Sequence, residues 1–314
     1  MEEFALSAVR NLLCGVLTLL PIPAQAWAQQ PLPAKGPPPD LSVRDIEKPS
    51  PALAAIESEV RRDLQSHPDS APLLYKLGLV LRQENKPKES LETYTKAAKL
   101  EKPNADQLRS VALDYVLLDD FDDAVHWLRI AISLDPRNVD VLYSLGRCFY
   151  SQSKYPEAKE MFLRVLQINP EHLKAEENLG LIYDYSSQPD KAEAALRKAV
   201  TLAGDQSTDE WPFLDLGGFL LDQDRAAEAV PFLRRASAIA DKCAACHEKL
   251  GRALVATGDA NSGLKELETA EQLDPKNPKT HFQLGLAYRA LGALDKSRAE
   301  FALSQSLYGE HSHE

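Results

Sequence analysis

Residues 139–172 read VDVLYSLGRCFYSQSKYPEAKEMFLRVLQINPEH, and a stretch of this kind recurs along most of the chain. Its dipeptide Leu145-Gly146 belongs to a periodic series of six Leu-Gly pairs, whose successive glycines lie 68, 34, 37, 34 and 34 residues apart. The gap of 68 residues is two periods, with Val111-Ala112 at its midpoint, and the gap of 37 is one period plus three residues. A fixed period of this length predicts repeats that bury their apolar faces against one another. Seven repeats result, at residues 71–104, 105–138, 139–172, 173–206, 210–243, 244–277 and 278–311.

Two kinds of side chain recur at fixed places in these repeats. A small residue follows the glycine position by twelve residues, and a bulky residue comes four later. The small residues are Ser90, Ala124, Ala158, Ala192, Ala229, Gly263 and Ser297, and the bulky ones are Tyr94, Leu128, Phe162, Leu196, Leu233, Leu267 and Phe301. Small residues let two helices approach closely, and a bulky side chain fills the space beyond them. With turn signals such as Asn169-Pro170 at the repeat ends, each repeat is predicted to be two antiparallel helices.

This pattern resembles the tetratricopeptide repeat. Repeat 139–172 carries the family's spacing most fully, through Leu142, Leu145-Gly146, Phe149, Ala158, Phe162 and Pro170. The resemblance covers roughly three quarters of the chain, and Glu176 and Val111-Ala112 depart from the family's usual residues. It implies an all-α, right-handed superhelical solenoid of about seven helix pairs. Residues 53–70 look like the second helix of an incomplete repeat and are expected to cap the N-terminal end of the array.

The first 52 residues are predicted to be a targeting segment and a linker. Residues 11–22 form an apolar run that is shorter than the ~20 residues needed to cross a bilayer. Two small-x-small patterns within residues 24–28 then suit a signal peptidase. We expect a cleaved signal peptide at 1–28, a Pro-rich linker at 29–52, and export to the periplasm or the extracellular side of a bacterial envelope. Because Glu2 and Glu3 make a poor n-region, a misassigned start or an uncleaved interfacial segment stays an alternative.

Composition and motifs narrow the class of function. The chain has 36 Lys and Arg against 47 Asp and Glu, a net charge of −11, which argues against nucleic-acid binding. It contains no Gly-rich phosphate loop, no G-x-S-x-G and no H-E-x-x-H motif. The carboxylates between Asp119 and Asp123 fall at a predicted helix–helix turn, where solvated cap residues are expected rather than an acid/base pair. We therefore expect a protein that is not an enzyme.

The resemblance implies an adaptor that binds a protein or peptide segment in a groove lined mainly by the first helix of each repeat. Aromatic and Arg side chains are common interface anchors, and they suit an extended or acidic guest. Projecting the family's inward positions onto this sequence gives Tyr75, Arg82, Arg109, Tyr143, Arg147, Tyr150, Tyr185, Trp211, Arg252, Phe282 and Arg289. The chaperone-binding sub-family is excluded, because Tyr75 and Leu79 stand where its carboxylate clamp needs Lys and Asn.

By analogy with the family, the partner could belong to an envelope-associated complex. The chain stops directly after the second helix of the last repeat, which could leave Phe301 and its neighbours exposed. Self-association through this repeat is one interpretation of that exposure, and a frayed end is the other.

Residues 243–247 read CAACH, which is the attachment pattern of a c-type haem. A haem-carrying electron-transfer protein, with Cys243, Cys246 and His247 holding the group and His281 as a second axial ligand, is therefore the alternative function. The same run also fits an ordinary repeat junction, so a Cys243–Cys246 disulfide and a plain pair of thiols stay open.

The sequence gives weaker evidence for metal binding by its other Cys and His residues. A zinc site lacks a second pair of thiols, and Cys148 falls at a buried helix position where inert packing is expected. The histidines in the tail 310–314 are expected to be part of a disordered end rather than a metal site.

Overall fold

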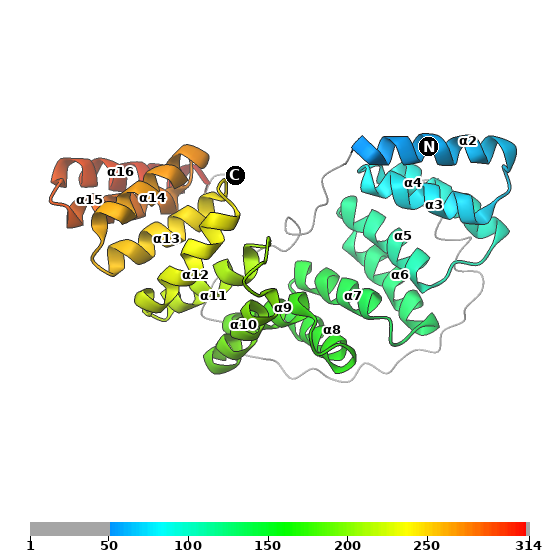
Figure 1. Ribbon diagram of the computed structural model, residues 1–314, viewed down its shortest axis with the longest axis horizontal. Coiled ribbons are helices and arrows are strands. Elements are labelled where there is room, and N and C mark those ends of the chain that lie inside the picture. Colours follow the sequence, from blue (N-terminus) through cyan, green and yellow to red (C-terminus); the bar gives the residue numbers. More distant parts are fainter. Residues whose placement is uncertain (1–50, 312–314) are drawn as a thin grey trace. The chain divides into compact units, whose positions relative to one another are not determined.

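The computed structural model describes residues 51–311, and every regular element in that range is an α-helix (Figure 1). These residues form two compact parts, which divide between Ala175 and Glu176. The N-terminal part contains α2 (Pro51–Ser66), α3 (Ala71–Gln83), α4 (Pro87–Leu100), α5 (Ala105–Leu117), α6 (Phe121–Leu134), α7 (Val139–Ser151) and α8 (Tyr155–Ile168). The C-terminal part begins within α9 (Leu173–Tyr185) and continues with α10 (Pro189–Ala203), α11 (Trp211–Asp222), α12 (Ala226–Ile239), α13 (Ala244–Ala256), α14 (Ala260–Leu273), α15 (Pro278–Ala290) and α16 (Leu294–His311).

Within each part the helices pack in sequence order, as an α-solenoid requires. The two helices of a repeat contact each other, as α7 and α8 do, and the second contacts the first helix of the next repeat, as α6 and α7 do. First helices one repeat apart also contact each other in the pairs α3 with α5, α5 with α7, α11 with α13 and α13 with α15. Helix α2 packs on α3 through Val60, which is fully buried against Leu77 and Leu81. The predicted all-α solenoid is confirmed.

Close approach within a repeat depends on the glycine position. A Cβ added to Gly146 would lie 2.6 Å from Cε1 of Phe162, so the Phe162 ring occupies the space that a side chain would need. Phe162 itself is fully buried. The predicted pairing of a small residue with a bulky one is therefore what joins α7 to α8.

A left-handed residue ends the first helix of every repeat. These residues are Asn85, Asp119, Ser153, Ser187, Asp224, Gly258 and Gly292, with φ between 54° and 92°. In each case the next residue donates its N–H to the carbonyl five positions earlier, at 2.8–2.9 Å, as in Gln188 to Tyr183. This Schellman arrangement satisfies a carbonyl at the helix end and fixes the turn into the second helix.

Five of these seven turns carry a side chain in a conformation that glycine adopts more easily. Replacing exposed Ser187 by glycine should therefore raise the free energy of unfolding by about 1 kcal/mol, which corresponds to a thermal midpoint ~2–4 °C higher. The reverse change, Gly292→Ser, should lower stability by a similar amount, although a Cβ there would meet nothing within 4 Å. Equal midpoints for the two variants and the unchanged protein would contradict the assignment of strain to this position.

A buried polar contact joins the first two repeats. The Ser90 hydroxyl lies 2.8 Å from the Gly78 carbonyl oxygen and 2.6 Å from Oδ2 of Asp114, and Ser90 and Asp114 are fully buried. Burial raises the pKa of Asp114 to about 8, against the lowering effects of the Ser90 hydrogen bond and the Arg82 charge. A protonated Asp114 can donate to the Ser90 oxygen while Ser90 donates to Gly78, so the proton completes the chain of hydrogen bonds.

Candidate functional site

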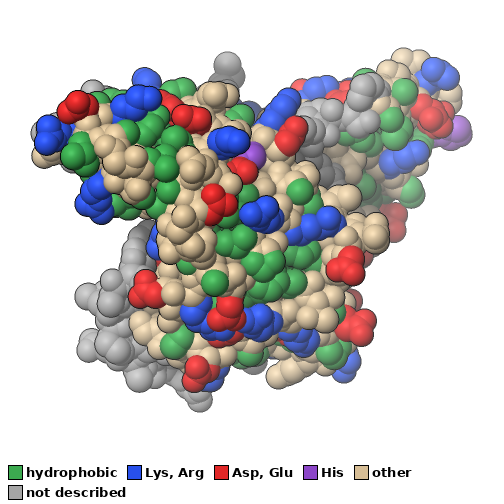
Figure 2. Space-filling view, turned by 60° about the vertical axis from the view of Figure 1, so that its left-hand side comes forward, with side chains coloured by type: hydrophobic (Ala, Val, Ile, Leu, Met, Phe, Trp, Pro, Cys, Tyr) green, Lys and Arg blue, Asp and Glu red, His purple; other side chains and the backbone are tan. Residues whose placement is uncertain are grey.

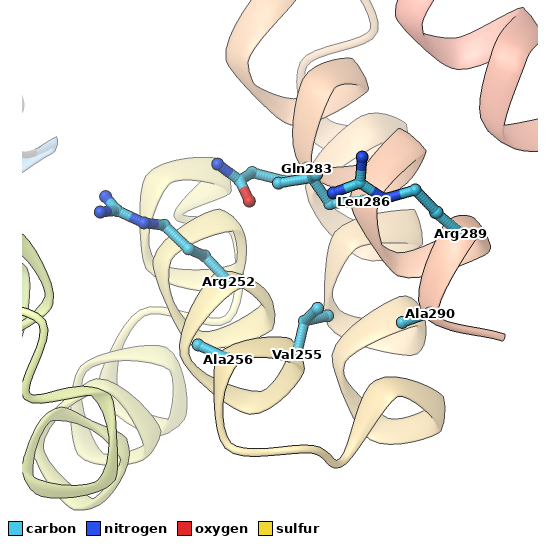
Figure 3. Close-up of a pocket in the computed structure, with 7 residues that line it drawn as sticks. All are labelled: Arg252, Val255, Ala256, Gln283, Leu286, Arg289 and Ala290. Carbon is cyan, nitrogen blue, oxygen red and sulfur yellow. The ribbon is translucent and has the colours of Figure 1, made fainter.

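A pocket lies between α13 and α15 in the C-terminal part. It has a volume of about 530 Å³ and is lined by Arg252, Val255 and Ala256 of α13 and by Gln283, Leu286, Arg289 and Ala290 of α15 (Figure 3). Both sets have a spacing of three or four residues, which places them on one face of each helix. The opposite faces bury Leu250, Leu254, Leu284 and Ala287. One face of each helix is therefore buried in the array, while the other face lines the pocket.

The pocket combines an apolar floor with positively charged walls. Val255, Leu286 and two alanines supply the floor, and Gln283 adds an amide. The Arg252 guanidinium lies 3.1 Å from Oδ1 of Asp222 on α11. Arg289 is exposed and forms no ion pair with any residue between 51 and 308. An acidic or carboxylate-bearing group flanked by apolar side chains matches this lining.

Lys249 on α13 and Lys279 on α15 add positive charges near Arg252, and Glu248 on α13 adds a carboxyl group. Burial raises the pKa of Glu248, one turn before Arg252, while Lys249, Arg252 and Lys279 act in the opposite direction. Elsewhere Lys and Arg side chains alternate with Asp and Glu over the face visible in Figure 2, with hydrophobic side chains between them. The two arginines at the pocket thus contrast with the mixed charges on that face and with the net charge of −11 of the whole chain.

The predicted groove residues fall into three groups. Arg252 and Arg289 line the pocket. Tyr75 and Tyr150 are buried, the first with its hydroxyl donating to the Glu101 carbonyl at 2.6 Å and the second with its ring against Tyr155. The other seven are partly or fully exposed: Arg82, Arg109, Tyr143, Arg147, Tyr185, Trp211 and Phe282.

Two of the exposed rings also pack on neighbours. Tyr143 lies 4.9 Å from the His172 ring, and Phe282, with 46% of its surface exposed, lies 5.4 Å from the Phe301 ring. Phe301 is itself half-buried, so its predicted exposure is partial. As binding residues, this set stays a prediction.

Sequence reasoning missed the uncharged part of the pocket. Val255, Ala256, Gln283, Leu286 and Ala290 were not among the predicted groove residues. The signal that could have found them is the spacing of three or four residues from Arg252 and Arg289, which places them on the same helix faces.

The CAACH segment contains a disulfide between Cys243 and Cys246. Cys243 is the N-cap of α13, and Cys246 is fully buried. Nδ1 of His247 lies 2.7 Å from Oε2 of Glu266, and Nε2 lies 3.1 Å from the Asp241 carbonyl oxygen. Both sulfurs and both ring nitrogens are engaged, so this arrangement does not fit a covalently attached haem, and the haem hypothesis stays a prediction. Within residues 51–311 the third cysteine, Cys148, is buried, which raises the pKa of its thiol to about 12.

Family models for the tetratricopeptide repeat match residues 71–104, 139–172 and 177–206, and a model described as TPR repeat matches 251–292. The chain is a tetratricopeptide repeat protein. The matches at 71–104 and 139–172 have the bounds of two repeats that the period predicts, the match at 177–206 lies within the repeat 173–206, and the match at 251–292 spans parts of two repeats.

Known tetratricopeptide repeat proteins resemble the chain at low identity. Anaphase-promoting complex subunit 3 of Schizosaccharomyces pombe is 22% identical over 201 residues, which are 63% of this chain and 30% of that protein. The crystal structure of PilW, described as a type IV pilus biogenesis factor, has a TM-score of 0.57 and 18% identity, covering 65% of this chain and 94% of that one. The crystal structure of YrrB, described as a TPR protein with an unusual peptide-binding site, has a TM-score of 0.50 and 16% identity, covering 59% and 94%. At these identities the structures support the fold.

Proposed function

We propose that this protein is an exported, non-enzymatic scaffold that binds a segment of a partner protein in the pocket between α13 and α15. The observation that carries the proposal is the pairing of two arginines with an apolar floor on adjacent first helices. An aliphatic side chain of the partner would occupy the floor, while a neighbouring carboxylate would pair with Arg289 and draw Arg252 from Asp222. The partner is accordingly an extended acidic segment with aliphatic residues between its carboxylates.

The fold supports an interaction role because helical repeat arrays expose extended binding surfaces. Export to a bacterial envelope, with a partner in an envelope complex, is proposed on the sequence of residues 1–28, which lie outside the described residues. No helix within residues 51–311 is both long and apolar enough to span a bilayer.

Peptide selection tests this proposal. Random peptides displayed on phage are selected against the full chain, and the selected peptides are expected to be rich in Asp or Glu alternating with Leu, Ile or Val. By fluorescence anisotropy, the double variant Arg252→Ala/Arg289→Ala should bind a selected peptide at least about 100-fold more weakly, because it loses two charge-assisted hydrogen bonds that contribute about 1.5–3 kcal/mol each. Binding should also weaken as salt is raised.

The matched control is Arg298→Ala on α16, which removes a 78% exposed arginine outside the pocket and should leave affinity unchanged. Wild-type affinity in the double variant would place peptide binding elsewhere on the chain. The remaining predicted groove residues could then be tested through the triple variant Tyr143→Ala/Arg147→Ala/Trp211→Ala.

A further inference from the structure

His281 lies at the centre of a cluster that spans the last three helices. Its side chain, on α15, is only 1% exposed, and Nδ1 lies 2.8 Å from Oε2 of Glu300 on α16. Nε2 lies 2.9 Å from the Pro275 carbonyl oxygen. Glu271 of α14 brings a second carboxylate, and one ligand atom from each of Glu271, His281 and Glu300 lies within 4.8 Å of the other two.

The contact with Pro275 fixes where the ring hydrogen resides. A carbonyl oxygen only accepts hydrogen bonds, so Nε2 carries the hydrogen and donates it. Nδ1 then faces the Glu300 carboxylate, which also has only lone pairs to offer. Two such atoms approach to 2.8 Å only if a proton lies between them or a metal ion binds both.

The preceding repeat provides an internal comparison. His247 is 34 residues earlier and makes the same two contacts, with Glu266 through Nδ1 and with the Asp241 carbonyl through Nε2. At that pair a proton is sufficient to balance the charge, because the charges of one imidazolium and one carboxylate sum to zero. The residue that corresponds to Glu271 in that repeat is Ser237, so the second carboxylate is absent.

At His281 a proton leaves the charge unbalanced. One imidazolium with two carboxylates sums to −1, whereas a divalent cation with neutral imidazole and two carboxylates sums to zero. Burial makes such an imbalance costly. Glu300 is 20% exposed and Glu271 is half-buried, so both side chains can adjust toward the ~2.0–2.2 Å metal–ligand distances of zinc.

We propose that Glu271, His281 and Glu300 bind a divalent transition metal ion of the zinc class. Imidazole and carboxylate ligands suit this class, and three protein ligands leave a fourth position for water. The Pro275 carbonyl would hold the ring in the ligating tautomer, as backbone carbonyls commonly do at metal-bound histidines. Because the ligands come from α14, α15 and α16, the ion would clamp the last repeat to the one before it.

Calorimetric titration with zinc chloride tests the site. The full chain carries His311→Ala and His313→Ala to remove the histidines of its tail, and it is dialysed against chelator and then against chelator-free buffer. One equivalent of Zn²⁺ should bind with a dissociation constant in the micromolar range or below. Glu271→Gln should weaken binding at least tenfold while keeping the His281–Glu300 contact that supports folding. His247→Gln, at the matched pair, should leave zinc binding unchanged.

Cobalt provides a second readout. Co²⁺ bound at this site should give visible absorption bands that Zn²⁺ displaces and that Glu271→Gln abolishes. No binding at 100-fold excess of zinc over protein, or binding that is the same in Glu271→Gln, would overturn the proposal and assign the cluster to a structural ion pair. Peptide affinity at the α13–α15 pocket is measured separately, so the two proposals stand or fall independently.

Discussion

Replacing Phe162 by alanine should lower the stability of the repeat 139–172 by about 3–5 kcal/mol. The Phe162 ring is fully buried, occupies the space over Gly146 and lies 5.7 Å from the Tyr143 ring, so truncation would leave a cavity between α7 and α8. Because repeat arrays can unfold in parts, the measurement is hydrogen exchange resolved by segment. Amides of α7 and α8 should lose protection first.

The adjacent residue provides the control for this variant. Leu163 is 39% exposed, so Leu163→Ala should change protection by no more than about 1 kcal/mol. If Phe162→Ala left α7 and α8 as protected as in the unchanged protein, the glycine–phenylalanine contact would not be what joins the two helices.

The stability of the first two repeats should fall as pH rises from 6 to 8. Asp114 has a pKa of about 8 in the folded chain and near 4 when unfolded, so the folded state holds the extra proton between these values. Its contribution is fully present below pH 4 and is lost as pH rises toward and through 8. The loss between pH 6 and 8 should be about 2 kcal/mol.

Urea denaturation at the two pH values, compared with Asp114→Asn, checks this dependence. The asparagine amide donates to Ser90 at every pH, as the protonated acid does. The free energy of unfolding of the variant should therefore not fall with pH through residue 114, and at pH 8 the variant should be more stable than the unchanged protein. The control is Asp119→Asn at an exposed left-handed position that asparagine also tolerates, and its slope should equal that of the unchanged protein. Equal slopes for Asp114→Asn and the unchanged protein would mean that Asp114 folds in its charged form.

The helix pairs were predictable because they depend on residues that recur at a fixed spacing. The distance from Gly146 to Phe162 along the chain sets both the helix lengths and the contact between them. Depth of burial was less predictable. Tyr75 and Tyr150 occupy first-helix positions that face inward in the family, yet both side chains are buried. The position within the repeat does not by itself reveal this burial.

Polar contacts between helices were the least predictable part. The pairing of His247 with Glu266 joins residues 19 positions apart on different helices, and the addition of Glu271 around His281 needs a third helix. The recurring small and bulky residues that reveal the helix pairs do not indicate which polar side chains of those helices contact one another. The choice among disulfide, thiols and haem at Cys243 was likewise open in the sequence, because the same five residues suit all three.

The three extra residues between the fourth and fifth repeats have a practical consequence. The segment that begins at Gly204, with φ of 68°, lies outside the Schellman turns, and Arg235 donates to the carbonyls of Asp205 and Ser207 from a neighbouring helix. Asp205 and Gln206 are exposed, and no helix includes them. We expect this segment to tolerate an affinity tag or a spectroscopic label. The three extra residues already present here do not shift the register of the repeats on either side.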